Sequence, residues 1–337
     1  MGEVSEGLKQ EFTKAHKALM DANSVCIISH LNPDGDAVGS NLALRHALEA
    51  QGKKVTSACV DPLPPNCQWL KAADKFVQDF EYQEHDVIVS VDCGALKLVA
   101  FHESKPEILS GKKPFINFDH HGSNDNFGTI NPVEPDACAT SFIMYQFFRM
   151  FRWKITVDMA TALMHGIYFD TGGLMHSNTC SMVYKMSGDL QMKGANLQKI
   201  AKELFHTTPV NKMRLWGRIL ERMYVNDENV VVSAVNQNDY KACGANSKDT
   251  SGAIDYLNSV PGSEYCVLLS EGENGLVKGS LRTRKDDLNL SEVASKWGGG
   301  GHPKASGFGM NGKLKPKMTW TIETENGEEG GSEKHDF

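Results

Sequence analysis

Short apolar runs alternate with helical patterns over the first 190 residues. Four runs rich in β-branched residues, each bounded by polar or turn residues, predict buried strands at 24–29, 54–60, 86–91 and 114–119. Between the first two, residues 37–52 have helical periodicity and end at Gly52, which is typical of a helix end. Strands that alternate with helices predict an α/β domain, built on a parallel sheet with helices on both faces.

The pattern changes twice further along the chain. Residues 138–222 are mostly helical, and their Met and aromatic stripes indicate core packing rather than function. From 229 onward a smaller α+β domain with a mixed sheet is predicted, with strands at 229–235, 264–272, 276–284 and 317–324 and helices near 249–259 and 290–297. We therefore expect a first domain at 1–190, a helical linker at 191–225, a second domain at 226–325 and a disordered tail at 326–337.

Composition narrows the class of protein. The 337 residues fit two domains at about 150 residues each. The net charge of −7 excludes a protein that coats nucleic acid through its overall charge, but it leaves room for a local basic groove. The sequence has no apolar run near the roughly 20 residues that cross a membrane, no secretory signal pattern and no CxxC pair among its eight cysteines. We expect a cytoplasmic protein that does not act at a membrane.

Acidic and histidine residues follow three of the predicted strands. His30, Asp34 and Asp36 come after the first strand, in a turn enforced by Pro33 and Gly35. Three further clusters stand in similar places: Asp92 after the strand at 86–91, Asp119-His120-His121 after the strand at 114–119, and Asp170 after an apolar helical run. Each cluster alone could be a helix cap or a turn. Together they predict one crevice at the carboxyl ends of the strands.

Carboxylates that converge in one crevice repel one another unless cations neutralise them. Asp and neutral His suit Mn²⁺ or Mg²⁺, and the lack of clustered cysteines argues against structural zinc. Two ions fit a set of six ligands: His30, Asp34, Asp36, Asp92, His120 and Asp170. Asp92, central in sequence order, is the candidate bridge. Two such ions would hold a hydroxide between them and clamp phosphoryl oxygens, so the set predicts phosphoester or phosphoanhydride hydrolysis.

The segments HLNPDGDAVGS, VSVDCG, FDHHGSN and YFDTGGL resemble the four motifs of the DHH phosphoesterase superfamily. The resemblance implies that one metal is held by His30, Asp34 and Asp92. A second metal would be held by Asp36, Asp92, His120 and Asp170. It also implies that Asp119 lies behind these ligands and that His121 faces the scissile phosphate, so His121, Asp92 and Asp119 are the expected catalytic residues.

A glycine-rich segment, WGGGGHPKASG at 297–307, is the second informative feature. Glycine amides approach an anion closely, and a helix beginning there would add its dipole. Upstream, we expect Arg282 and Arg284 on one face of a strand, where they would bind phosphate. This pairing resembles the DHH-associated C-terminal domain, which implies a nucleotide-end site at Arg282, Gly300, Gly301 and His302.

The two-domain length most resembles the stand-alone bacterial oligoribonuclease and pAp-phosphatase branch of this superfamily. That resemblance implies an enzyme that hydrolyses short single-stranded RNA, linear dinucleotides or pAp with two divalent ions, with Mn²⁺ favoured over Mg²⁺. The C-terminal domain would grip one terminal nucleotide. A manganese pyrophosphatase or exopolyphosphatase is the alternative enzyme, although its substrates have no base or sugar for Arg282 and the glycine segment to grip. A non-catalytic nucleotide-binding protein is disfavoured because all six ligands are present. The preferred substrate, the polarity of digestion and the oligomeric state, with a homodimer as one alternative, stay open.

Overall fold

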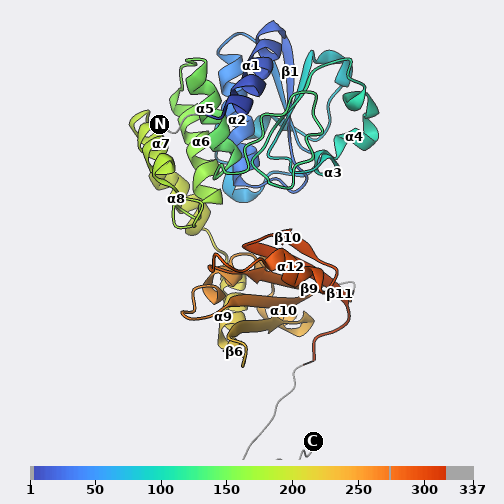
Figure 1. The fold of residues 1–337 in the computed structure, drawn as a ribbon, viewed down its shortest axis with the longest axis vertical. Helices are drawn as coiled ribbons and strands as arrows, with labels where there is room; N and C mark the ends of the chain where they lie inside the picture. The colour runs from blue at the N-terminus through green and yellow to red at the C-terminus, as the bar shows by residue number, and fades with distance from the viewer. Residues whose placement is uncertain (1–3, 273–274, 316–337) are drawn as a thin grey trace, which may run out of the picture. The chain divides into compact units, whose positions relative to one another are not determined.

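The computed structural model describes residues 4–272 and 275–315 and divides into two compact units, Met1–Thr207 and Thr208–Phe337 (Figure 1). The division falls between helix α8 (Leu197–Phe205) and helix α9 (Val210–Glu221). Each unit has its own sheet and its own hydrophobic core. The strand expected at 317–324 and the tail expected at 326–337 lie outside the described residues.

The first unit contains a five-stranded sheet whose strands are all parallel, in the order β3-β2-β1-β4-β5. Its strands are β1 (Ser24–Ser29), β2 (Lys54–Ala58), β3 (Phe76–Val77), β4 (Val87–Val91) and β5 (Phe115–Phe118). The four strands predicted from the sequence are confirmed to within two residues. The edge strand β3 was not predicted, because two residues are too few to form a pattern.

Helices cover both faces of this sheet, as predicted, but unevenly. The long helices α1 (Glu6–Asp21), α2 (Gly35–Glu49), α5 (Thr140–Met150) and α6 (Val157–Asp170) lie together on one face in Figure 1. The other face carries only the short helices α3 (Leu96–Val99) and α4 (Phe101–Ser104) together with 3₁₀ turns. Strand β1 serves both cores, because Val25 and Ile27 face the long helices while Cys26 and Ile28 face the short ones.

Strand order places a crevice at the middle of the sheet. From β1 the chain proceeds to β2 and β3 on one side, and it then crosses back to β4 and β5 on the other side of β1. The carboxyl ends of β1 and β4 are therefore neighbours from which the chain departs in opposite directions. Ligands of open parallel sheets bind at such a reversal point.

Helices α2 and α6 both reach this crevice, and they pack unusually closely. A Cβ atom added at Gly39 of α2 would lie 2.5 Å from the Ala162 carbonyl oxygen of α6, so only glycine fits there. Helix α2 begins at the crevice with Gly35, and helix α6 ends there with Asp170. Helices α7 (Ser181–Met192) and α8 complete the first unit.

The second unit is built on a six-stranded sheet in the order β10-β11-β9-β8-β7-β6. Only β7 and β8 are parallel neighbours, so the sheet is mixed, as predicted. Its elements are β6 (Tyr224–Val225), β7 (Val230–Val235), α10 (Gln237–Cys243), α11 (Ala253–Leu257), β8 (Tyr265–Glu271), β9 (Leu276–Arg282), α12 (Leu290–Ser295), β10 (Gly300–His302) and β11 (Ala305–Asn311). Leu215 and Ile219 of α9 are buried in its core.

The glycine-rich segment forms a hairpin, and the strand before it is shorter than expected, so the expectation that Arg282 and Arg284 share a strand face was wrong. No helix begins there, because α12 ends before the glycines and β10 and β11 form an antiparallel hairpin. Glycine serves close approach instead, since a Cβ atom added at Gly299 would lie 2.2 Å from the Gly307 carbonyl oxygen. Strand β9 ends at Arg282, so Arg284 does not share a strand face with it and lies exposed beyond the strand.

Candidate metal centre

The crevice at the carboxyl ends of β1 and β4 brings the six residues of the expected ligand set together. His30, Asp34 and Asp92 form one group, and Asp36, His120 and Asp170 form another, with the candidate ligand atoms of each group within 4.8 Å of one another. His121 also lies within this distance of Asp92 and His120. These two groups correspond to the two ligand sets that the family resemblance implied.

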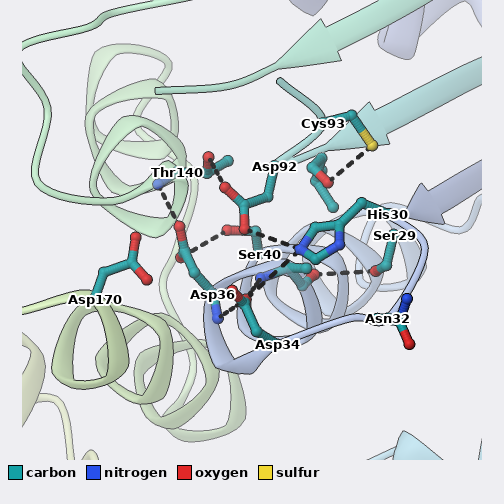
Figure 2. A network of polar contacts seen from close by, with 12 residues as sticks. Ser29, His30, Asn32, Asp34, Asp36, Ser40, Asp92, Cys93, Thr140 and Asp170 are labelled. Atoms are coloured by element: carbon teal, nitrogen blue, oxygen red, sulfur yellow. Dashed lines mark hydrogen bonds and ion pairs between the residues drawn. The ribbon is translucent and has the colours of Figure 1, made fainter. Parts of the chain in front are cut away.

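Asp92 joins the two groups. Its Oδ2 atom lies 3.6 Å from Nε2 of His30, and its Oδ1 atom lies 3.5 Å from Nε2 of His120. Asp92 directly follows β4 and has a φ of 62°, a left-handed conformation that few residues other than Gly, Asn and Asp adopt readily. This turn directs the carboxylate into the crevice, where it is 2% exposed and lies beside His30 in Figure 2.

Two histidines are held so that one ring nitrogen faces inward. Nδ1 of His30 donates a hydrogen bond to the Leu31 carbonyl oxygen at 2.8 Å, and Nδ1 of His120 donates to the Ala137 carbonyl oxygen at 3.2 Å. A carbonyl oxygen only accepts, so each Nδ1 carries a proton and Nε2 is the nitrogen that faces the crevice. Histidine ligands of metals are typically held in this way.

The start of α2 positions two carboxylates. Asp34 caps this helix, and its Oδ1 atom accepts hydrogen bonds from the backbone N–H groups of Asp36 and Ala37. Asp36 is fully buried, and its two oxygens accept the backbone N–H groups of Thr140 and Ser141 at the N-terminus of α5. The helix dipole favours a negative charge there.

Sequence analysis missed Thr140 and Ser141 because they follow none of the charged motifs. Glycine at position 166 makes their approach possible, since a Cβ atom there would lie 2.5 Å from Oδ1 of Asp36 and 2.1 Å from Oγ of Ser141. Helix α6 thus leaves space for a carboxylate and a hydroxyl beside its backbone. The only sequence signal for this arrangement was an unexplained glycine within an apolar helix.

The cluster holds more negative charge than its buried surroundings support. Burial, together with the charge of Asp92, raises the pKa of Asp36 to about 7, and burial beside Asp36 and Asp92 raises the pKa of Asp170 well above its ordinary value. Burial lowers the pKa of His30, but hydrogen bonds and charge from Asp34 and Asp92 outweigh this and raise it to about 11. Divalent cations would remove this strain, and the oxygen and imidazole donors suit Mn²⁺ or Mg²⁺.

His121 is held differently from His120. Its Nδ1 atom donates to Oδ1 of the buried Asp119 at 2.7 Å, and the other oxygen of Asp119 accepts the side-chain amide of Asn124 at 2.6 Å. The hydrogen bond that His121 donates to Asp119 raises the pKa of His121 to about 9. The side chain of His121 is 44% exposed, so it is accessible at the crevice surface. The role of Asn124 was not predicted, although the residue belongs to the third motif.

The residues expected to bind substrate in the second unit lie at one end of its sheet. His302 pairs with Ala305 across the β10–β11 hairpin, and Ala305 pairs with Arg282 of β9. This register places His302 and Arg282 two strands apart. Lys285 and Lys304 form ion pairs with Glu264 and Asp286, whereas no carboxylate partner of Arg282 or Arg284 occurs within residues 4–272 and 275–315. Gly300 and Gly301 are exposed in β10.

Two family models match the chain. The N-terminal domain of the DHH family matches residues 24–167, and the DHHA1 domain matches residues 227–324. The chain therefore belongs to the DHH family, and the phosphoesterase class expected from the four motifs is confirmed. Among residues that the structure describes, no helix is both long and apolar enough to span a membrane.

The similarity to individual relatives extends over both domains. A bifunctional oligoribonuclease and PAP phosphatase NrnA from Thermus thermophilus is 31% identical over 86% of this chain and 84% of its own length. The protein of the same name from Bacillus subtilis is 23% identical over 85% of this chain and 88% of its own. The crystal structure of an exopolyphosphatase-related protein from Bacteroides fragilis superposes with a TM-score of 0.81 at 25% identity and covers 92% of both chains.

Proposed function

We propose that this chain is a two-metal hydrolase that cleaves phosphate esters of short oligoribonucleotides, linear dinucleotides or pAp. The observation that carries the proposal is the position of Asp92. Its two oxygens face two separate groups of His and Asp side chains, as expected of a carboxylate that bridges two ions. The two activities for which the NrnA relatives are named, oligoribonuclease and PAP phosphatase, support the substrate class.

Each group would hold one ion. His30 and Asp34 would bind the first ion, Asp36, His120 and Asp170 would bind the second, and Asp92 would bind both. When bound, the pair would supply Lewis-acid activation of a water molecule and neutralise charge on the phosphoryl group. The water oxygen replaces the ester oxygen at phosphorus, and the departing nucleoside oxygen takes up a proton.

His121 would contribute a positive charge beside the reacting phosphate. Asp119 binds its Nδ1 atom, so Nε2 is the ring nitrogen left to contact a non-bridging oxygen. Asn124 in turn fixes Asp119, which makes the imidazole orientation independent of substrate. A preorganised donor of this kind stabilises charge that develops in the transition state.

Arg282 and His302, with Arg284 and the exposed amides of Gly300 and Gly301, would bind the terminal nucleotide. Arg282 and Arg284 are suited to this role because neighbouring lysines are neutralised by carboxylates while these two arginines are not. Nη1 of Arg282 donates to the Leu281 carbonyl oxygen, and an arginine without a carboxylate partner keeps the other N–H groups of its fork for a phosphate. Pyrophosphate offers no sugar or base to such a site.

The test is hydrolysis by the purified chain with Mn²⁺ of four substrates: pAp, pApA, a five-nucleotide RNA and pyrophosphate. The proposal expects turnover of one or more of the nucleotide substrates at a kcat/KM far above that for pyrophosphate. Preferential cleavage of pyrophosphate would overturn it in favour of the alternative enzyme, a pyrophosphatase. Repeating the assay with Mg²⁺ decides the metal, for which we propose Mn²⁺.

We also propose a cytoplasmic location. All eight cysteines lie within the described residues as free thiols, and seven of them are buried, which suits a reducing compartment. Fractionation of cells followed by detection of the chain tests this, and recovery with membranes would contradict it.

A further inference from the structure

Thr140 contacts both central carboxylates, one through its backbone and the other through its side chain. It is the first residue of α5 and is completely buried. Its backbone N–H group binds Oδ2 of Asp36, while its hydroxyl donates to Oδ1 of Asp92 at 3.0 Å. Figure 2 shows Thr140 beside Asp36 and Asp92 on the side of the crevice away from His30.

The hydroxyl bond restricts rotation of the Asp92 carboxylate. Oδ1 of Asp92 accepts the hydrogen bond from the Thr140 hydroxyl and lies 3.5 Å from Nε2 of His120. Oδ2 lies 3.6 Å from Nε2 of His30. A carboxylate turns about its terminal bond over a broad range of angles, since this torsion has no sharp minima. A donor fixed on one oxygen therefore decides which oxygen faces which group.

Thr140 is itself held firmly. The first two residues of α5 each donate a backbone N–H group to the Asp36 carboxylate. Thr140 binds Oδ2, and Ser141 binds Oδ1 at 2.9 Å. Ser40 reinforces the same carboxylate through its hydroxyl at 3.3 Å. The hydroxyl of Thr140 thus projects from a rigid helix end, and its position relative to Asp36 is set by backbone contacts.

We propose that Thr140 is a positioning residue for the two-metal centre, which orients Asp92 so that each oxygen serves one ion. The inference rests on the proposed two-metal function. In this role Thr140 does not contact the substrate. Its contribution is the geometry of the bridge and the spacing between Asp92 and Asp36.

The test is the isosteric Thr140→Val variant, which removes the hydroxyl and retains the shape and the backbone N–H group. Titration of Mn²⁺ into the metal-free chain by calorimetry should show about 10-fold to 100-fold weaker binding, the usual cost of removing a partner of a metal ligand. The electron paramagnetic resonance spectrum should lose the signature of exchange-coupled Mn²⁺ pairs. Thr140→Ser, which keeps the hydroxyl, should restore both.

Thr161→Val is a matched control. Thr161 is also buried, at 9% exposure, and its hydroxyl accepts a bond from the Asn196 backbone at a place remote from Asp92. It should bind Mn²⁺ as the unaltered chain does. In an Asp92→Asn background, Thr140→Val should have no further effect, because the two residues act through one bond.

The outcomes separate this inference from the function on which it rests. If the unaltered chain binds two Mn²⁺ ions and Thr140→Val binds them equally well with the same spectrum, the positioning role is wrong and the metal centre stands. If Thr140→Ser behaves like Thr140→Val, the hydroxyl is not the responsible group, and the role is again wrong. If the unaltered chain binds no pair of ions, the proposed function fails and the inference fails with it.

Discussion

Nδ1 of His121 lies 2.7 Å from Oδ1 of Asp119, whereas Nδ1 of the adjacent His120 is bound by a backbone carbonyl oxygen. The Nδ1 atoms of these two neighbouring histidines therefore bind different acceptors, a neutral carbonyl oxygen and a charged carboxylate. The carbonyl partner of His120 leaves Nε2 as the nitrogen that faces Asp92 and Asp170, whereas the carboxylate partner of His121 favours a charged ring. This difference predicts different losses when each ring is removed.

His120→Ala should weaken Mn²⁺ binding, because it removes a proposed ligand. His121→Ala should bind Mn²⁺ normally and lower kcat, because it removes a charge that acts on the transition state. Calorimetric titration of Mn²⁺ and steady-state kinetics on one nucleotide substrate measure the two effects. Equal loss of Mn²⁺ affinity in both variants would show that His121 is also a ligand.

Asp92→Asn should lower hydrolysis by more than about 100-fold, since it removes the proposed bridge itself and not merely a partner of a ligand. The fold should persist, because Asn accepts the left-handed backbone at this position. Thermal melting with and without Mn²⁺ gives the measurement. Ion binding at 100 times its dissociation constant stabilises a protein by about 2.7 kcal/mol, and this gain should disappear in the variant. A variant that unfolds without metal would assign Asp92 a structural role.

Arg282→Ala should raise KM for pApA about tenfold to hundredfold and change kcat little. A charged hydrogen bond of about 1.5–3 kcal/mol, made equally in the ground and transition states, affects binding alone. The control substrate is a small phenyl phosphate ester, which would not reach Arg282. A uniform loss on both substrates would mean that Arg282 supports the fold, and no loss on either would mean that it is a solvated side chain.

Acid should destabilise the second unit through Asp239. Burial raises the pKa of this carboxyl, but hydrogen bonds from Arg222 and from the backbone of Asn236 outweigh it, and the net pKa lies below 3.8. A lowered folded-state pKa contributes stability that is complete above the unfolded value and is lost as pH falls through the folded one. Asp239→Asn should therefore cost about 1.5–3 kcal/mol at pH 7, and this cost should shrink as pH falls through the lowered pKa of Asp239.

The test is denaturant unfolding of the full chain at several pH values. Tryptophan fluorescence reports the unfolding of the second unit, which contains Trp216 and Trp297. Asp255→Asn provides a control, because Asp255 is exposed and makes no ion pair among the described residues. A loss from Asp239→Asn that does not shrink anywhere on the acid side, down to the pH at which the chain unfolds, would contradict the role of its charge.

The sequence located the metal-centre candidates because their signal is local. Asp92 directly follows β4, and His120 lies two residues beyond the end of β5. Both strands are rich in apolar residues, and parallel strands bring their carboxyl ends to one edge of the sheet. Helix α1 was missed although Phe12 and Leu19 are fully buried, because its charged residues mask a narrow apolar stripe. The β10–β11 hairpin was missed because its glycines also suit a loop.

Thr140 and Asn124 could not have been assigned from the sequence. Their roles depend on where α5 begins relative to Asp92 and on how the loop after His121 folds back onto Asp119. Neither contact has a periodicity or a composition of its own. Both contacts arise from tertiary packing, which leaves no local pattern in a single sequence.

The left-handed backbone at Asp92 also constrains how this chain can change during evolution. Asn and Gly are the other residues that accept such a conformation readily, and each is one nucleotide substitution away from an Asp codon. Both lack the negative charge that the proposed two-metal centre requires. Under that proposal, the mutations most easily reached and best tolerated at this position are those that would remove the bridge while they preserve the fold. A duplicated copy of the gene has a short path from an enzyme to a protein that only senses the nucleotide.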